Sequence, residues 1–308
     1  MALDKEHLQY PHRSYGMDHE RYSWSMLSDR PPVRWPNGAD LALWVNVPLQ
    51  FFPLDQRGKP FAVPGGMTMP YPDLRHFSLR DYGNRVGIYR FLRAFDQQGV
   101  RPTFAFNTQL AERNPYLLDK ILARGDEILC HGWNMDSLHY GGMPHDEEAA
   151  LVEQSLSRLR GLTGQAITGW ISPARNESEH TPDLLAQHGV RYFCDWVNDD
   201  MPYAFTTESG ELVAMPLATE LEDTFIMMNN LHSEQSWLEQ VSDACDFLLQ
   251  EATSKGGRAL ALNIHPWMLG QPHRIKKLEE ALAYIMQQPG VWNASASEIV
   301  DAWQSQQQ

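Results

Sequence analysis

The stretch DEILCHGWNMDS, residues 126–137, determines how the rest of the sequence is interpreted. Its apolar run ILC, residues 128–130, is typical of a short buried strand. The run stops at His131, and Gly132-Trp133 follow. An imidazole and an indole separated by a glycine therefore stand where a buried strand ends. Two interpretations are open: a loop histidine with ordinary hydrogen-bond partners, or part of an active site.

Strand-like and helix-like segments alternate on both sides of this stretch. We expect strands at residues 39–47, 102–107, 127–130, 166–171, 190–194, 211–216, 259–264 and 291–295. We expect helices at residues 86–97, 115–124, 146–162, 181–188, 235–253 and 272–287, with a short helix at the end. Alternation on this scale predicts parallel strands wrapped by helices. The number of such units favours a (β/α) barrel over an open sheet.

The sequence contains no internal repeat and no linker, so residues 41–308 are expected to form a single barrel domain. Residues 1–40 are rich in Pro, Arg, His and aromatic residues, which predicts an irregular N-terminal arm that packs on a neighbouring part of the chain or on another subunit. Residues 49–83 are dense in Pro, Gly and aromatic residues, as in a loop that covers a functional site. The apolar content of both segments favours burial between subunits and therefore a homo-oligomer.

The composition restricts the class of partner. Apolar residues make up 43% of the chain, enough for a large core, and the formal net charge is −14. Nucleic acid and anionic membranes would repel a chain this acidic, whereas small neutral or weakly charged substrates are compatible with it. The N-terminus carries charges where a signal peptide needs an apolar stretch, and no window is apolar enough to span a membrane. We therefore expect a cytoplasmic protein that acts on a small molecule.

Polar residues follow four of the expected strands. In order along the chain they are His131; Ser172 and Arg175; Asp195 with Asp199 and Asp200; and His265. The chemistry of such barrels takes place at the carboxyl ends of the strands, which meet at one rim. We therefore expect these groups to face one another. This convergence favours the active-site interpretation of His131.

At this point the sequence resembles the polysaccharide deacetylase family, and within it a branch of cofactor-independent allantoinases that hydrolyse a cyclic ureide. The resemblance covers roughly residues 30–300. The blocks that carry it are RGDEILCHGW (124–133), LTGQAITGWISPARNESEHTPDLLAQHGVRYFCDW (162–196), NDDMPY (198–203) and IHPWMLGQPHRIKKLEEAL (264–282). The resemblance implies a distorted, incomplete (β/α) barrel. Because the related allantoinases are oligomeric, it also favours a tetramer.

The resemblance implies a metal site that this sequence does not preserve. Deacetylases of the family hold a divalent metal with an Asp from a paired-acid motif after the first strand and with two His spaced HxxxH. Here Gln50 and Phe51 stand at the acid positions, and Met135 stands four residues after His131. Zinc normally needs three protein ligands, so one His is too few. We expect neither a metal nor another cofactor.

Without a metal, a cyclic imide or ureide is the easier target, because its leaving nitrogen is conjugated to a second carbonyl. We expect His131 or Asp195 to activate water and His265 to assist proton transfer, since imidazole titrates near neutrality. The residues expected to bind the substrate are Gln50, Trp133, Ser172, Arg175, Glu220 and Trp267. For Trp133 and Trp170, core packing competes with a role as pocket walls. For the acids at 220, 222 and 223 a solvated face is favoured, with Glu220 as the exception.

Two other functions stay open. The chain could be a catalytically silent binding protein that kept the fold and lost the acids. It could also be a deacetylase with a relocated metal site, for which His139, His145, Asp146 and Glu147 are a candidate cluster. Acids at a helix N-terminus explain that cluster more simply.

Overall fold

The computed structural model describes residues 19–56 and 73–307. The strands are β1 (Leu41–Leu49), β2 (Thr103–Phe106), β3 (Glu127–Cys130), β4 (Gly169–Trp170), β5 (Tyr192–Phe193), β6 (Tyr203–Thr207), β7 (Gly210–Ala214), β8 (Arg258–Asn263) and β9 (Val291–Asn293). The α-helices are α1 (Leu74–Tyr82), α2 (Ile88–Gln98), α3 (Thr108–Arg113), α4 (Pro115–Leu122), α5 (His145–Thr163), α6 (Thr181–Gln187), α7 (Glu234–Lys255), α8 (Ile275–Gln287) and α9 (Ala296–Gln304). Short π-helical turns lie at Gly83–Gly87 and Phe225–Asn229, and 3₁₀ turns at Pro36–Gly38 and Pro173–Arg175.

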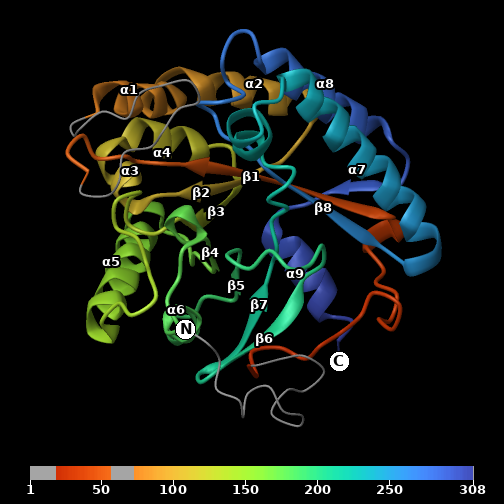
Figure 1. The fold of residues 1–308 in the computed structure, drawn as a ribbon, viewed down its shortest axis with the longest axis horizontal. Coiled ribbons are helices and arrows are strands. Elements are labelled where there is room, and N and C mark those ends of the chain that lie inside the picture. The colour runs from red at the N-terminus through yellow and green to blue at the C-terminus, as the bar shows by residue number, and fades with distance from the viewer. Residues whose placement is uncertain (1–18, 57–72, 308) are drawn as a thin grey trace.

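The strands form one curled sheet in the order β6-β7-β5-β4-β3-β2-β1-β8, with β9 paired to β1. Neighbouring strands are parallel except for β6 and β7, which form an antiparallel hairpin at one edge. The sheet stays open because its edge strands β6 and β8 do not pair with each other, and helices cover its outer side (Figure 1). The expected distorted, incomplete (β/α) barrel is confirmed.

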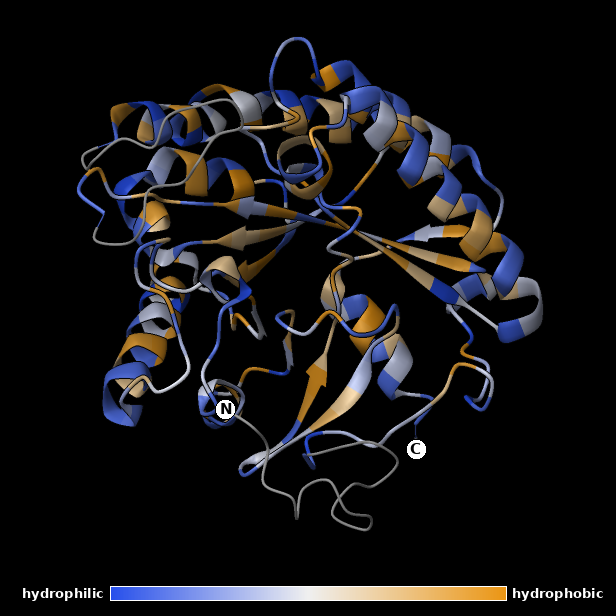
Figure 2. Cartoon of the chain, in the orientation of Figure 1, coloured by the Kyte–Doolittle hydropathy of each residue, from blue (hydrophilic) through white to orange (hydrophobic). Residues whose placement is uncertain are grey.

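The two faces of β1 show how the sheet is buried. Every residue from Leu41 to Leu49 is buried, as expected for a parallel strand covered on both sides. Leu43 packs into a large core beneath the outer helices, while its neighbour Trp44 packs into a second core inside the curl. Ile299 of α9 belongs to that inner core. Figure 2 shows the same division, with hydrophobic strands and hydrophilic outward faces on α7 and α8.

Local sequence sets the ends of the long helices. Helix α5 begins with Asp146, Glu147 and Glu148, whose negative charges favour the helix N-terminus. It ends at Gly164, which takes the left-handed conformation (φ 68°) that glycine adopts without strain. Both signals can be read from the sequence, so the expected bounds, 146–162, were close to the observed bounds, His145–Thr163.

Some segments fold differently from the expectation. Residues 74–82, the end of the expected loop 49–83, form α1, and residues 57–72 of that loop lie outside the described residues. The hairpin strand β6 and helix α3 were not predicted. The expected strands 166–171 and 190–194 shorten to two residues each in β4 and β5. Ile167, within the first of these segments, has a positive φ of 39°, which does not suit a strand.

The described part of the N-terminal arm packs on its own chain. Arg21 forms an ion pair with Asp183 at 2.8 Å, and Arg30 forms one with Asp199 at 2.5 Å. Residues 1–18 of the arm lie outside the described residues, and the expected homo-oligomer stays a prediction. Within the described ranges, no helix combines the length and the apolar character that a membrane crossing needs.

Two glycines offer a matched test of helix packing. A Cβ on Gly87, just before α2, would lie 2.0 Å from the Pro266 carbonyl oxygen, whereas a Cβ on Gly161 in α5 would meet nothing within 4 Å. We expect Gly87→Ala to lower the free energy of unfolding by about 2 kcal/mol or more through overpacking. Gly161→Ala should raise it by about 0.5–1 kcal/mol. Urea unfolding measures both, and equal effects would contradict this packing.

Candidate active site

The parallel sheet brings the predicted histidines to one rim. The ladder hydrogen bonds continue one residue past the strands: His131 N–H donates to the Phe106 carbonyl, and Ile171 N–H donates to the Cys130 carbonyl. His265 stands two residues after β8, which pairs with β1. The three loops that follow β3, β4 and β8 therefore leave the sheet at the same level.

His131 is buried, and its tautomer follows from its partners. Its Nδ1 lies 2.9 Å from the carbonyl oxygen of Ile171. A carbonyl can only accept, so Nδ1 carries the proton and Nε2 is an acceptor. The Nε2 atom lies 3.3 Å from the amide nitrogen of Gln50, which donates to it. Burial lowers the pKa of His131 to about 4, so the ring is neutral at physiological pH.

His265 is held in the opposite kind of environment. Asp223, which is fully buried, accepts two hydrogen bonds from it: one from the backbone N–H at 2.8 Å and one from Nδ1 at 2.7 Å. A carboxylate on Nδ1 fixes the tautomer and the orientation of the ring, as in other His–Asp pairs. The remaining nitrogen, Nε2, lies 3.8 Å from Oε1 of Glu222. His265 is therefore oriented for proton transfer at Nε2.

Arg175 and Glu222 complete the charged part of the rim. Arg175 Nη2 donates to Glu222 Oε2 at 2.6 Å, and the Glu222 side chain is largely buried. Burial raises the pKa of Glu222, but His265 and Arg175 together bring it below its ordinary value, so Glu222 is ionised. The charges of His265 and Arg175 also lower the pKa of His131. The rim therefore holds four side chains that interact electrostatically: His131, Arg175, Glu222 and His265.

The contacts of Asp195 indicate a structural task. Its Oδ1 accepts from Ser172 N–H at 2.7 Å, and its Oδ2 accepts from Ser172 Oγ at 2.7 Å. Trp170 Nε1 donates to the same hydroxyl at 2.8 Å. Asp195 thus holds the start of the turn that carries Arg175, and both of its oxygens are engaged. The buried Trp170 belongs to the core and not to a pocket wall.

A second wall of the rim comes from α1, which the sequence analysis missed. Arg80 lies with its guanidinium carbon 3.5 Å from the centre of the Trp267 ring and 5.0 Å from that of Phe52. The Trp267 and His265 rings lie 5.7 Å apart. Burial lowers the pKa of Arg80 to about 9, although the Asp223 charge opposes this shift. Arg80 is therefore a buried cation beside the Asp223–His265 pair.

The structure brings most of the predicted site residues together at the rim, but not all of them. Gln50, His131, Arg175, His265 and Trp267 take part in the contacts described above. Trp133 is half-buried in the loop after β3. Its backbone carbonyl accepts a hydrogen bond from Gln109 N–H, which holds this part of the loop. Ser172 donates two hydrogen bonds to Asp195, one from its N–H and one from its hydroxyl.

The acid favoured among residues 220–223 was the wrong one. Glu220 is exposed, and the neighbouring Glu222 and Asp223, interpreted from sequence as a solvated face, are the buried acids at the rim. They follow an irregular run after β7 and not a strand end, so the strand-end rule did not single them out. A histidine at the rim that needs a carboxylate partner is the signal that could have done so.

The residues at the family's metal position do not fit a divalent metal. His131 gives Nδ1 to a carbonyl, and its Nε2 faces an amide nitrogen. Met135 stands where the second histidine is expected and is tied through its N–H to the Phe51 carbonyl. Across the described ranges, no group of three or more His, Cys, Asp or Glu side chains is arranged to hold a metal. The cluster proposed around His139 is likewise not such a group.

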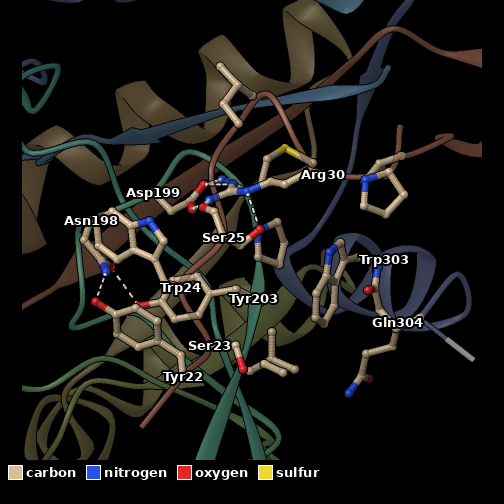
Figure 3. Close-up of a pocket in the computed structure, with 18 of the residues that line it drawn as sticks. Tyr22, Ser23, Trp24, Ser25, Arg30, Asn198, Asp199, Tyr203, Trp303 and Gln304 are labelled. Carbon is tan, nitrogen blue, oxygen red and sulfur yellow. Dashed lines mark hydrogen bonds and ion pairs between the residues drawn. The ribbon is translucent and has the colours of Figure 1, made fainter. Parts of the chain in front are cut away.

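A cavity of about 950 Å³ lies away from this rim, and Figure 3 shows it. Its walls come from the N-terminal arm, the β6–β7 hairpin and the end of α9, and Asp199 lines it, away from the rim where the sequence analysis expected that residue. The Arg30–Asp199 ion pair crosses it. Asp199 is thus used in anchoring the arm, and Asp200 contacts Arg258 at 3.2 Å.

Comparisons with known proteins agree with this architecture. A family model described as polysaccharide deacetylase matches residues 80–193. A putative polysaccharide deacetylase of Schizosaccharomyces pombe is 24% identical over 298 residues, covering 87% of this chain and 92% of that protein. The solved structures of a probable polysaccharide deacetylase from Pseudomonas aeruginosa PAO1 and of Puue allantoinase each have a TM-score of 0.81 and 23% identity, covering 92% of this chain and 98% of the other. The two structures show that the fold is shared.

The Asp223–His265 pair can be tested by one isosteric change. Asp223→Asn keeps the shape but removes the negative charge beside His265 Nδ1. We expect kcat to fall by about 10²–10⁴-fold, the range of a general acid–base contribution. Asp243→Asn, at an exposed position on α7, is the matched control and should leave kcat unchanged. A folded Asp223→Asn variant with wild-type kcat would remove the pair from the mechanism.

Proposed function

We propose that this chain is a hydrolase of carbon–nitrogen bonds other than peptide bonds, because residues 80–193 match a polysaccharide deacetylase family model and the chain shares its fold with a probable polysaccharide deacetylase. We propose further that it opens a small cyclic ureide or imide and does so without a metal. One observation carries the metal-independent part: His131 Nε2, the ring nitrogen that the Ile171 carbonyl leaves available, faces the amide nitrogen of Gln50. A zinc site normally needs three protein ligands, and within the described ranges no group of three or more His, Cys, Asp or Glu side chains is arranged to hold a metal.

The chemistry of the rim selects the substrate class. A zinc-bound water has a pKa of about 7, against 15.7 for bulk water, so a metal supplies hydroxide at neutral pH. Proton transfer from ordinary water to one imidazole is less powerful and favours an activated carbonyl. A cyclic imide or ureide provides one, because the nitrogen that leaves is stabilised by a second carbonyl. The comparison with Puue allantoinase, which has the same fold, supports this class.

His265 is the better candidate to activate water. With Asp223 on Nδ1, its Nε2 accepts a proton from water, and the water oxygen forms a bond to the ring carbonyl carbon. The carbon–nitrogen bond then breaks, and the proton on Nε2 passes to the leaving nitrogen. Arg175, whose side chain remains partly exposed, is placed to stabilise the oxygen that gains charge.

His131 serves a different purpose in this scheme. A ring with a pKa of about 4 is a weak base at neutral pH and removes protons from water poorly. Its Nε2 lone pair accepts a hydrogen bond well, and a ureide or imide ring N–H can replace the Gln50 amide as donor. Gln50 then turns its amide to the substrate. His131 and Gln50 would in this way recognise an N–H beside a carbonyl.

Two alternatives are tested by the same assay. A deacetylase with a relocated metal would act on N-acetyl groups and would need the metal. A silent binding protein would bind a ureide without turnover. The His–Asp pair supports the proposed hydrolase over the silent protein, because a carboxylate on Nδ1 leaves Nε2 of His265 directed for proton transfer.

The activity and its metal dependence are measured together. We expect purified protein to open at least one member of a panel of cyclic ureides and imides, with turnover unchanged after prolonged chelation, because no step uses a metal. Elemental analysis should find no stoichiometric metal. An N-acetylated sugar in the same panel tests the deacetylase alternative.

Loss of turnover on chelation, with recovery on adding zinc, would contradict the proposal and favour the deacetylase. Asp223→Asn protein, assayed alongside, shows whether turnover comes from this rim.

A further inference from the structure

The fully buried side chain of Asn107 bonds to both of the loops that carry Gln50 and His131. Asn107 directly follows β2, the strand that lies between β1 and β3. Its Oδ1 accepts a hydrogen bond from Phe51 N–H at 2.8 Å, and its Nδ2 donates to the His131 carbonyl oxygen. An N–H can only donate and a carbonyl can only accept, so these partners fix the orientation of the Asn107 amide.

The Asn107 amide takes the place of one more peptide group in the sheet. At the end of β2 the backbone ladder still holds, because Asn107 N–H donates to the Leu49 carbonyl at 3.0 Å. On the other side, His131 N–H donates to the Phe106 carbonyl at 2.9 Å. The backbone of β2 then turns into α3, where the Asn107 carbonyl accepts from Ala111 N–H. From that point the Asn107 side chain supplies the acceptor toward the loop after β1 and the donor toward the loop after β3.

Three consecutive donors at the start of α3 hold the loop after β3 by the three consecutive carbonyls of residues 131–133. The donors are the side-chain nitrogen of Asn107 and the backbone N–H groups of Thr108 and Gln109, and both backbone bonds measure 3.0 Å. N–H groups in the first turn of a helix find no partner inside that helix. The Asn107 side chain bonds to the neighbouring loops instead of capping them. The start of α3 is therefore used to hold the loop that carries His131.

The peptide group between Gln50 and Phe51 is held at both of its polar atoms. Its N–H donates to Asn107 Oδ1 at 2.8 Å. Its carbonyl oxygen accepts from Asn84 Nδ2, also at 2.8 Å. Asn84 lies in the π-helical turn Gly83–Gly87. Because a peptide group is planar, bonds at both atoms fix its orientation and with it the point from which the Gln50 side chain extends.

The contact between Gln50 and His131 has little tolerance for movement. The Gln50 amide nitrogen lies 3.3 Å from His131 Nε2, so a shift of a few tenths of an ångström would break this hydrogen bond. In the sheet, β2 separates the strands that lead to these two residues. Asn107 spans that separation through one bond to each loop. Farther out, Met135 N–H donates to the Phe51 carbonyl at 3.0 Å and joins the two loops directly.

We propose that Asn107 is a positioning residue that sets the distance between the Gln50 amide and His131 Nε2. Recognition of a substrate N–H by this pair rests on the proposed function, whereas the geometry of the pair does not. Asn107 acts through the backbone of the neighbouring loops, and the substrate does not contact it in this scheme. His265 is held separately by Asp223. Loss of the Asn107 bonds should therefore impair recognition more than proton transfer.

Asn107→Asp keeps the shape of the side chain and removes one of its two bonds. One carboxylate oxygen still accepts from Phe51 N–H, but the other faces the His131 carbonyl oxygen and has no hydrogen to donate. A protonated carboxyl group regains that donor, and burial favours its neutral form. The folded-state pKa of the introduced group then lies above its unfolded value of about 3.9. The stability that its proton supplies is present at low pH and is lost as the pH rises.

Thermal unfolding between pH 5 and pH 9 measures this loss without any substrate. We expect the Tm of Asn107→Asp, relative to wild type, to fall by about 3 °C or more from pH 5 to pH 9. Asn114→Asp is the matched control, because it makes the same change at the exposed residue that follows α3. Its difference from wild type should stay constant. A constant difference for Asn107→Asp would overturn the proposal.

Nitrogen-15 NMR of the two rim histidines separates positioning from packing. At pH 9 the His131 Nε2 signal of Asn107→Asp should differ from that of wild type, because the Gln50 donor has moved. At pH 5 the two proteins should give nearly the same His131 signal. The His265 signals should match wild type at both pH values, since Asp223 holds that ring. An unchanged His131 signal at pH 9, or an equal change at His265, contradicts the positioning role.

Kinetics give a readout that rests on the proposed function. At pH 9, Asn107→Asp should raise KM for a ureide or imide roughly 3- to 10-fold, the worth of one hydrogen bond, and leave kcat nearly unchanged. A fall in kcat at constant KM would count against the proposal. If wild type turns over no ureide or imide, the proposed function fails, while unfolding and NMR still decide the role of Asn107.

Wild-type protein provides a test if Asn107→Asp does not fold. The Phe51 N–H and the Asn107 Nδ2 hydrogen bonded to the His131 carbonyl should both exchange slowly with solvent, because each is engaged in a bond of the buried Asn107 amide. The side-chain amide of the exposed Asn114 should exchange rapidly. Rapid exchange at Phe51 or at the Asn107 side chain overturns the proposal by itself.

Discussion

The hydrogen bond from His131 Nδ1 to the Ile171 carbonyl determines what chemistry the rim can perform. It exists because β3 and β4 are parallel neighbours, so the loop after one strand meets the loop after the other. The carbonyl fixes the tautomer and turns the Nε2 lone pair toward Gln50. Burial then keeps the ring neutral. His131 is therefore a neutral hydrogen-bond acceptor at the rim.

The two rim histidines have environments that separate their roles. His131 has a carbonyl and an amide as partners and no carboxylate. His265 has Asp223 on one nitrogen and Glu222 near the other. Titratable groups whose surroundings drive their protonation apart are suited to different steps of one reaction.

The alternation of segments predicted a (β/α) barrel and its strand-end residues, and the family resemblance added that the barrel is distorted and incomplete. Alternating segments and parallel strands put His131 and His265 at one rim, where they are found in the described structure. The partners of those residues could not be predicted in the same way. Asp223 and Arg80 come from irregular or helical segments whose position depends on tertiary packing. Sequence reasoning also took Asp195 for a possible base, since nothing in the sequence shows that Ser172 engages both of its oxygens.

The central claim is that His131 is a neutral Nδ1–H imidazole that binds no metal, and nitrogen-15 NMR of the histidine rings measures this directly. The account predicts that His131 shows a protonated Nδ1 and an unprotonated Nε2 from pH 5 to pH 9, because its pKa is about 4. Addition of one equivalent of zinc should leave both nitrogen shifts unchanged. A His131→Gln sample assigns the signal. An imidazolium signal within that pH range, or a zinc-dependent shift of Nε2, would contradict the account.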